Sequence, residues 1–139
     1  MEPPFEIIEH PADIGFRCRG RTREELFANA SLAMMSLACD PVGIAESESR
    51  EIVTTGDSDE SLLFAWLAEI LAVADAEKMF FRRAEVTSAA AGRMYGRVFG
   101  EKYDKRRHDA GTYIKAVTMH QLWVKQSADG WEAQVFLDV

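Results

Sequence analysis

The sequence has 139 residues, of which 47% are hydrophobic and 28% charged, and its formal net charge is −7. This length predicts a single domain over residues 1–139, and the composition is that of a globular protein with its own core. Unaided binding to a phosphate backbone needs a basic face, which the net charge disfavours. Any role in RNA metabolism is therefore expected to run through a protein partner.

The predicted location is the cytoplasm. The N-terminal stretch lacks the basic start and apolar run of a signal peptide, and the longest apolar segment, within 62–74, is interrupted by Glu69. We therefore expect no membrane association. Cys18 and Cys39 are the only cysteines and belong to no metal-binding or redox motif, so they are predicted to be free, buried or half-buried thiols. A monomer is the default oligomeric state.

Two strands are predicted at the start of the chain, over residues 5–10 and 14–20. In the second strand Ile14, Phe16 and Cys18 alternate with glycine and arginine residues. A repeat of two places these apolar side chains on one face of a strand. This strand is therefore expected to bury one face and expose the other.

Two amphipathic helices are predicted next, separated by a strand over residues 49–55. Thr22 followed by Glu25 forms a capping-box pattern at the start of the first helix, and Ser58 or Asp59 is predicted as the N-cap of the second. Each helix carries an apolar stripe spaced for burial. The stripes comprise Leu26, Ala30, Ala33, Met34 and Leu37 in the first helix, and Leu63, Trp66, Leu67, Ile70, Leu71 and Ala74 in the second.

The second half of the chain is predicted to be β-structure. Runs rich in branched and aromatic residues lie at 79–86, 93–100, 112–126 and 131–139. Asp129-Gly130 predicts a hairpin between the last two runs. The order ββ-α-β-α-ββββ predicts an α+β fold, in which two helices pack on one or two largely antiparallel sheets.

The turn after the first strand is one candidate functional site, because His10 and Asp13 bracket it. Functional side chains often project from such turns on a rigid scaffold. The alternative interpretation is structural. Asp13 can satisfy backbone amides of the turn, with His10 at the end of a strand.

The end of the chain is the second candidate site. An apolar strand runs to the last residue, so Asp138 stands beside the α-carboxylate of Val139. If Asp13 lies nearby, three carboxylates converge, which is costly unless a cation or a retained proton neutralises them. Oxygen ligands select hard divalent ions, namely calcium, magnesium or manganese. The alternative is a strand that simply ends there, with Asp138 solvated.

Lys115 is a third candidate, because it lies in an otherwise apolar predicted strand. It either pairs with a carboxylate or contacts a partner, or else it marks the solvent face of the strand. Alternation predicts one face with Lys115, Val117 and Met119, and an opposite face with Ile114, Ala116, Thr118 and His120.

The charged run 103–109 is the fourth candidate, and it contains Arg107 and His108. A run of this kind is either a solvated loop or a docking loop for an acidic surface or a phosphate. We keep both residues, together with His10, as candidates for contact with a partner.

Five segments together resemble the archease family. No single motif carries the resemblance, which depends on all five occurring in order over nearly the whole chain. The segments are HPADIGF (10–16), RTREELFANASLAMMSL (21–37), SLLFAWLAEILAVAD (61–75), GEKYDKRRHDAGTYIKAVTMHQLWV (100–124) and WEAQVFLDV (131–139).

The resemblance implies a role in RNA ligation. Archeases are protein cofactors of the RtcB-type RNA ligase, which carries manganese and joins tRNA halves and broken RNAs bearing a 2′,3′-cyclic or 3′-phosphate. They accelerate guanylylation of the ligase by GTP and permit repeated turnover in tRNA splicing and RNA repair. The resemblance therefore implies an activator with no catalysis of its own, and contact with RNA that is indirect if it occurs.

The resemblance also implies a metal site. In the family it is formed by residues that match Asp13, Asp138 and Val139, and the ion is usually described as calcium. Lys115 matches a lysine that looks functional in the family.

Two other functions remain open from the residues themselves. One is a metal-dependent enzyme with Asp13 and Asp138 as catalytic carboxylates, although the usual nucleotide-binding and hydrolase motifs are absent. Intrinsic turnover without the ligase would favour it. The other is a chaperone-like protein with wider clients in RNA modification, which would bind partners other than the ligase.

Overall fold

The structure is a computed structural model and describes residues 3–10 and 13–139. Its strands are β1 (Phe5–His10), β2 (Asp13–Gly20), β3 (Glu48–Thr55), β4 (Met79–Ser88), β5 (Arg93–Lys102), β6 (Ala116–Val117), β7 (Trp123–Ser127) and β8 (Gly130–Asp138). The helices are α1 (Arg23–Ala38), α2 (Asp59–Glu77) and the short 3-10 helix η1 (Pro41–Gly43). The predicted α+β class with antiparallel strands is confirmed.

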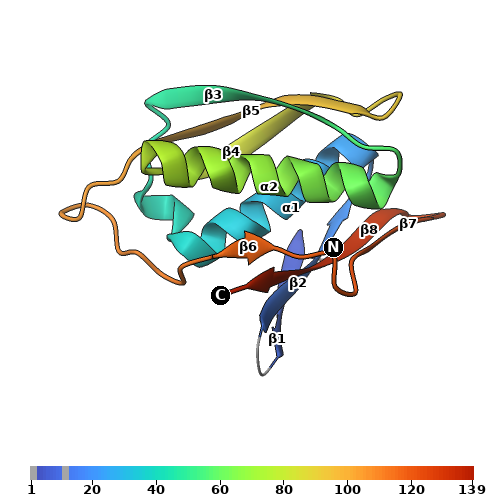
Figure 1. Cartoon of the computed structure of the whole chain (residues 1–139), viewed down its shortest axis with the longest axis horizontal. Helices are drawn as coiled ribbons and strands as arrows, with labels where there is room; N and C mark the ends of the chain where they lie inside the picture. Colours follow the sequence, from blue (N-terminus) through green and yellow to red (C-terminus); the bar gives the residue numbers. More distant parts are fainter. Residues whose placement is uncertain (1–2, 11–12) are drawn as a thin grey trace.

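Two antiparallel sheets enclose the two long helices (Figure 1). The larger sheet has the order β1-β2-β8-β6, with β7 also paired to β8, and the smaller sheet has the order β3-β5-β4. Both helices contact strands of both sheets, so one hydrophobic core fills the space between the sheets. Among the described residues, no helix combines the length and the hydrophobicity needed to cross a bilayer.

The helix starts follow the predicted caps. Thr22 caps α1 by accepting a hydrogen bond from the Glu25 N–H at 3.1 Å. In a capping box the Glu25 carboxylate would accept a hydrogen bond from the N–H of Thr22. It accepts instead from the N–H of Arg21, at 3.3 Å. Ser58 is the N-cap of α2 and forms a reciprocal capping box with Ser61. These bonds satisfy N–H groups that a helix start leaves without partners.

The predicted single strand over 112–126 is wrong. The run contains the two short strands β6 and β7, which pair with different parts of β8. Between them the chain makes a turn closed by a hydrogen bond from Leu122 N–H to Met119 O at 3.2 Å, with Gln121 in the left-handed region at φ 51°. The sequence gives no warning of this turn, because 113–126 contains neither glycine nor proline.

The alternation predicted around Lys115 is also wrong. Ile114 and Val117 are both buried, while Lys115 and Ala116 are exposed. Before β6 the chain is irregular and is tied to the end of α1 by a hydrogen bond from Thr112 N–H to the Leu37 carbonyl at 2.8 Å. A spacing of three between buried residues is possible because only two residues here form a strand.

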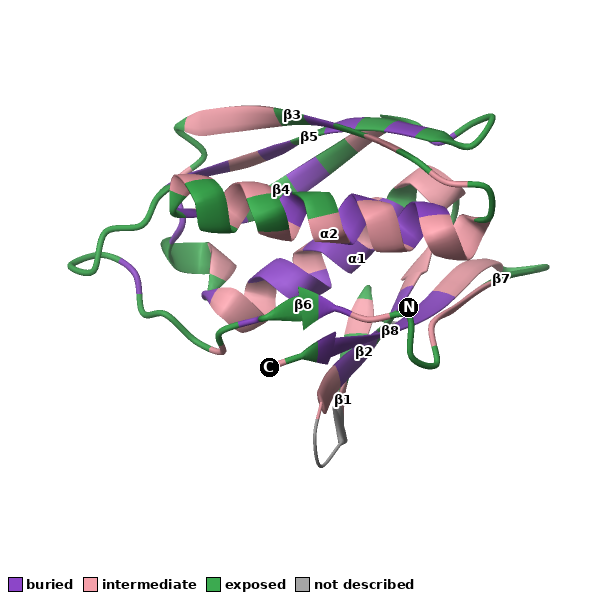
Figure 2. Ribbon diagram, viewed as in Figure 1, coloured by how far each residue is buried: buried purple, intermediate pink, exposed green. Residues whose placement is uncertain are grey.

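In the described part of the chain, one face of the larger sheet carries no helix (Figure 1). β8 is nevertheless buried on both of its faces, without interruption from Ala133 to Leu137, whereas β5 largely alternates between buried and exposed residues (Figure 2). The turn at 119–122 provides part of the cover, because the Gln134 side chain donates a hydrogen bond to the Gln121 carbonyl at 2.9 Å.

Both cysteines are free and buried, as predicted. Burial raises the pKa of the Cys18 thiol to about 12 and also raises the pKa of Cys39. Since the thiolate is the reactive form, neither residue should react at neutral pH in the folded protein. We expect iodoacetamide to label both thiols in denaturant and neither without it, as measured by intact mass. Rapid labelling of the native protein would contradict the buried placement.

Candidate functional site

Strand pairing brings the start of β2 beside the end of β8. In the antiparallel register of β2 and β8, Asp13 lies directly opposite Asp138. On its other side Asp138 pairs with Ala116 of β6, and Asp13 pairs with His10 of β1. The expected proximity of Asp13 to the end of the chain is therefore present in the fold.

The two aspartates occupy the kind of pair in which side chains approach most closely. The Asp138 carbonyl accepts a hydrogen bond from the Lys115 N–H at 2.8 Å, so it points toward β6 and away from β2. Asp13 and Asp138 therefore form a non-hydrogen-bonded pair, for which Cα atoms are about 4.5 Å apart. Directly opposed residues share a face of the sheet. Here it is the outer face, because the neighbouring Leu137 is fully buried in the core.

A glycine and an aromatic ring hold this end of the sheet in register. Gly15 pairs with Phe136, and a Cβ atom on Gly15 would lie 2.6 Å from Cδ1 and Cε1 of that ring. The Phe136 carbonyl accepts two hydrogen bonds from Thr118, from its N–H at 3.1 Å and its hydroxyl at 2.9 Å. The last residue is fixed as well, since Val139 is half-buried against the core.

The chemistry of this end suits a hard cation. Asp13 is half-buried and Asp138 exposed, and the α-carboxylate of Val139 follows one residue later. Opposed like charges in a sheet are destabilising, and a cation removes the repulsion. Within the described part of the chain no three side chains of the types His, Cys, Asp or Glu gather to hold a metal. The expectation that the terminal carboxylate of Val139 supplies a third ligand stays a prediction.

Lys115 lies beside this acidic end through its backbone, and its side chain is exposed. Among the side chains that the structure describes, no carboxylate oxygen lies within 4.0 Å of its ammonium group, so the predicted ion pair is not seen. The solvent-facing alternative holds, and contact with a partner stays a prediction. The backbone of His10 is described but its side chain is not, so the prediction for that side chain stays untested.

The docking role predicted for His108 is not supported, because the side chain is buried. Its Nδ1 accepts a hydrogen bond from the Asp104 N–H at 3.0 Å, which leaves the proton on Nε2, 2.9 Å from Glu101 Oε2. Arg107 binds both oxygens of Glu101, at 2.6 and 3.0 Å. The guanidinium is half-exposed, so a docking role for Arg107 stays a prediction.

Glu101 is the residue that sequence reasoning missed. It is buried at the end of β5, and its pKa is lowered to about 2, first by a hydrogen bond from the Ala45 N–H and then by those from Arg107 and His108. The bond from Ala45 N–H measures 2.6 Å. Nothing in the local sequence distinguishes this glutamate from a solvated one. Its hydrogen bonds to Arg107 and His108 hold the charged run 103–109 in place, and only the fold reveals them.

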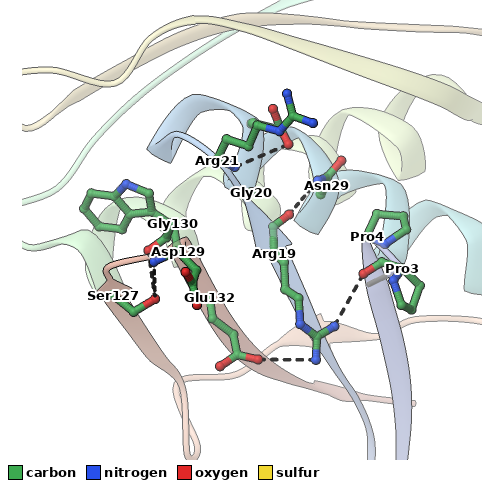
Figure 3. Close-up of a pocket in the computed structure, with 12 residues that line it drawn as sticks. Pro3, Pro4, Arg19, Gly20, Arg21, Asn29, Ser127, Asp129, Gly130 and Glu132 are labelled. Carbon is green, nitrogen blue, oxygen red and sulfur yellow. Dashed lines mark hydrogen bonds and ion pairs between the residues drawn. The ribbon is translucent and has the colours of Figure 1, made fainter. Parts of the chain in front are cut away.

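An open hollow of about 810 Å³ lies at the other end of β2 (Figure 3). Arg19 crosses it and forms an ion pair with Glu132 at 3.4 Å and a hydrogen bond to the Pro3 carbonyl at 3.4 Å. The Asn29 side chain donates to the Arg19 carbonyl at 2.6 Å. None of the predicted site residues lines this hollow.

Comparison with known proteins gives one family. Residues 5–139 match the model of the Archease protein family (MTH1598/TM1083). The chain is similar to the protein archease of Methanosarcina barkeri, with 39% identity over 97% of this chain and 95% of that protein. It is also similar to the protein archease of Pyrococcus abyssi, with 33% identity over 97% and 98% of the two chains.

Solved structures agree with this comparison. The solution structure of protein 1598 of Methanobacterium thermoautotrophicum superposes with a TM-score of 0.83 at 30% identity and covers 98% of this chain and 99% of that one. A Thermotoga maritima crystal structure, described as an archease and possible chaperone, gives a TM-score of 0.63 at 21% identity, covering 100% and 98%. The second likeness bears on the fold alone.

Proposed function

This chain belongs to the archease family, and from that premise we propose that it activates an RtcB-type RNA ligase. In this proposal it promotes guanylylation of the ligase and repeated turnover in tRNA splicing and RNA repair, and it catalyses no step itself. Cytoplasmic location and a monomeric state are part of the same proposal.

The observation that supports it most is the register that opposes Asp13 and Asp138 at the end of the chain. We name Asp13, Asp138 and the Val139 carboxylate the acidic tip. These groups would hold a divalent cation, with calcium favoured and magnesium or manganese as alternatives. The ion would neutralise the tip and orient its carboxylates toward the partner.

The charge of the tip suits its proposed place at the mouth of the ligase active site. A ligase that holds RNA must present a basic surface there, and complementary charge speeds encounter and fixes orientation. Once docked, the tip would help to place or exchange a divalent ion, or would favour the ligase conformation that reacts with GTP.

Guanylylation of a cognate ligase tests this proposal. We expect Asp138→Ala, and separately a two-residue extension after Val139, to reduce the stimulation at least tenfold while the protein stays folded. The matched control is Asp75→Ala, which removes an exposed carboxylate on α2. Full stimulation by both tip variants would remove the tip from the mechanism, and no stimulation by the unmodified chain would reject the function.

Calcium binding by the protein alone tests the metal separately. Titration calorimetry should show binding to the unmodified chain and to Asp75→Ala, and binding at least tenfold weaker for Asp138→Ala. If the unmodified chain stimulates the ligase but binds no calcium, magnesium or manganese, the tip acts through its charge alone. The proposal that the tip binds a divalent cation would then be wrong.

A further inference from the structure

A group of cationic and aromatic side chains lies on the outer face of the larger sheet. The Arg17 guanidinium lies over the Trp123 ring, 6.0 Å from its centroid, and the Lys125 ammonium lies 4.4 Å from the same centroid. The Gln134 side chain joins these strands by accepting a hydrogen bond from Arg17 Nε at 3.0 Å. We call Arg17, Trp123 and Lys125 the cationic cluster.

The charges of the cationic cluster are not balanced by the nearby glutamates, because these glutamates form ion pairs with Arg19 instead. In the strand register Glu6 lies opposite Arg17, and Glu132 lies opposite Lys125. Both glutamates instead contact Arg19, at 3.5 and 3.4 Å. Counting only side chains that the structure describes, neither Arg17 nor Lys125 has a carboxylate at ion-pair distance.

The three cations and two glutamates of this region carry together a net charge of +1, in a protein of net charge −7. They are Arg17, Arg19, Lys125, Glu6 and Glu132. Arg17 and Lys125 are exposed and the Trp123 ring is half-buried, and none of the helices that the structure describes covers this face (Figure 1). A half-buried indole in contact with two exposed cations is a site for an anionic, planar ligand.

The cationic cluster is continuous with the acidic tip. Arg17 is four residues from Asp13 on β2, which corresponds to about 13 Å at the rise of a strand. The side chains of Asp13 and Arg17 point to the same face, because residues an even number apart share a face. A ligand that extends from the ligase active site past the tip would reach the cationic cluster without leaving this face.

We propose that the cationic cluster contacts single-stranded RNA bound by the ligase, an inference that rests on the proposed function. The ligase surface around its RNA must be basic and would repel Arg17 and Lys125, whereas the RNA phosphates attract them. The exposed Arg17 guanidinium also offers a plane for stacking by bases. The contact with RNA is then direct, which changes the expectation drawn from net charge alone.

A titration with RNA alone tests the cationic cluster without the ligase. Fluorescence anisotropy of a labelled single-stranded RNA oligonucleotide is measured at several salt concentrations with the unmodified chain, Arg17→Ala/Lys125→Ala and the control Arg93→Ala/Lys105→Ala. The control removes two exposed cations elsewhere. Loss of two contacts should reduce the slope of log affinity against log salt by about 1.4, at ~0.7 per contact for single strands. Equal slopes for all three proteins, or no binding by the unmodified chain, would overturn the inference.

A second titration separates RNA contact from ligase contact. Binding of the same three proteins is measured to the ligase loaded with a 3′-phosphate RNA and to the ligase without RNA. We expect Arg17→Ala/Lys125→Ala to weaken binding at least fivefold only when RNA is present. Equal weakening without RNA would assign the cationic cluster to the ligase surface and overturn the inference. Failure of the unmodified chain to stimulate guanylylation would reject the proposed function, while the titration with RNA alone still decides the inference.

Discussion

Replacing Trp66 with alanine should lower the free energy of unfolding by about 3–5 kcal/mol, the range for truncating a fully buried large aromatic residue. Trp66 is fully buried and joins both helices to the smaller sheet. Its Nε1–H donates to the Ser31 hydroxyl at 2.7 Å, and its ring lies over Gly96, where an added Cβ would be 2.8 Å from Cη2. The substitution leaves a cavity and removes a buried hydrogen bond.

Urea unfolding followed by far-ultraviolet circular dichroism measures this effect without depending on tryptophan fluorescence. Trp66→Phe is the matched control, because it keeps most of the ring volume and loses only the N–H donor. Its cost should be about 1–2 kcal/mol, that of a lost buried hydrogen bond with some loss of packing. An alanine variant no less stable than the phenylalanine variant would show that α2 does not pack as described.

Replacing Glu101 with alanine should cost about 3 kcal/mol of stability, because it leaves the Ala45 N–H, Arg107 and His108 without their shared acceptor. The side chain of Glu101 is only 8% exposed, so solvent cannot replace these bonds fully. Glu101→Gln should cost less, since the amide oxygen still accepts from one or two donors.

The contribution of Glu101 should depend on pH in the acid range. Its pKa falls from the ordinary value of 4.5 to about 2 in the folded protein. A lowered folded pKa gives stability that is fully present above pH 4.5 and is lost as the pH falls toward 2. The stability difference between the unmodified protein and Glu101→Gln should therefore shrink over this window.

Chemical denaturation at several pH values between 2 and 7 measures that difference. Glu85→Gln is a suitable control, because this glutamate lies on the exposed face of β4. A constant difference between the unmodified protein and Glu101→Gln across the acid range would show that the carboxylate is not held by the network. The control variant should show a small difference at every pH.

The sequence alone determined the elements whose signals are local. Caps at Thr22 and Ser58, a repeat of two in β2 and turn residues before Gly130 fix where helices and strands begin, because each depends on residues a few positions apart. The five segments that resemble archeases also identified the family, which the comparisons confirmed.

Only the tertiary structure decided features that need partners distant in the chain. The break between β6 and β7 depends on Thr118 and Gln121 finding acceptor and donor groups on β8. Glu101 is buried because Ala45 and the loop after β5 converge on it. Arg19 frees Arg17 and Lys125 by taking carboxylates from two other strands. Such pairings depend on how the strands and loops are brought together in the fold, and no local pattern encodes that register.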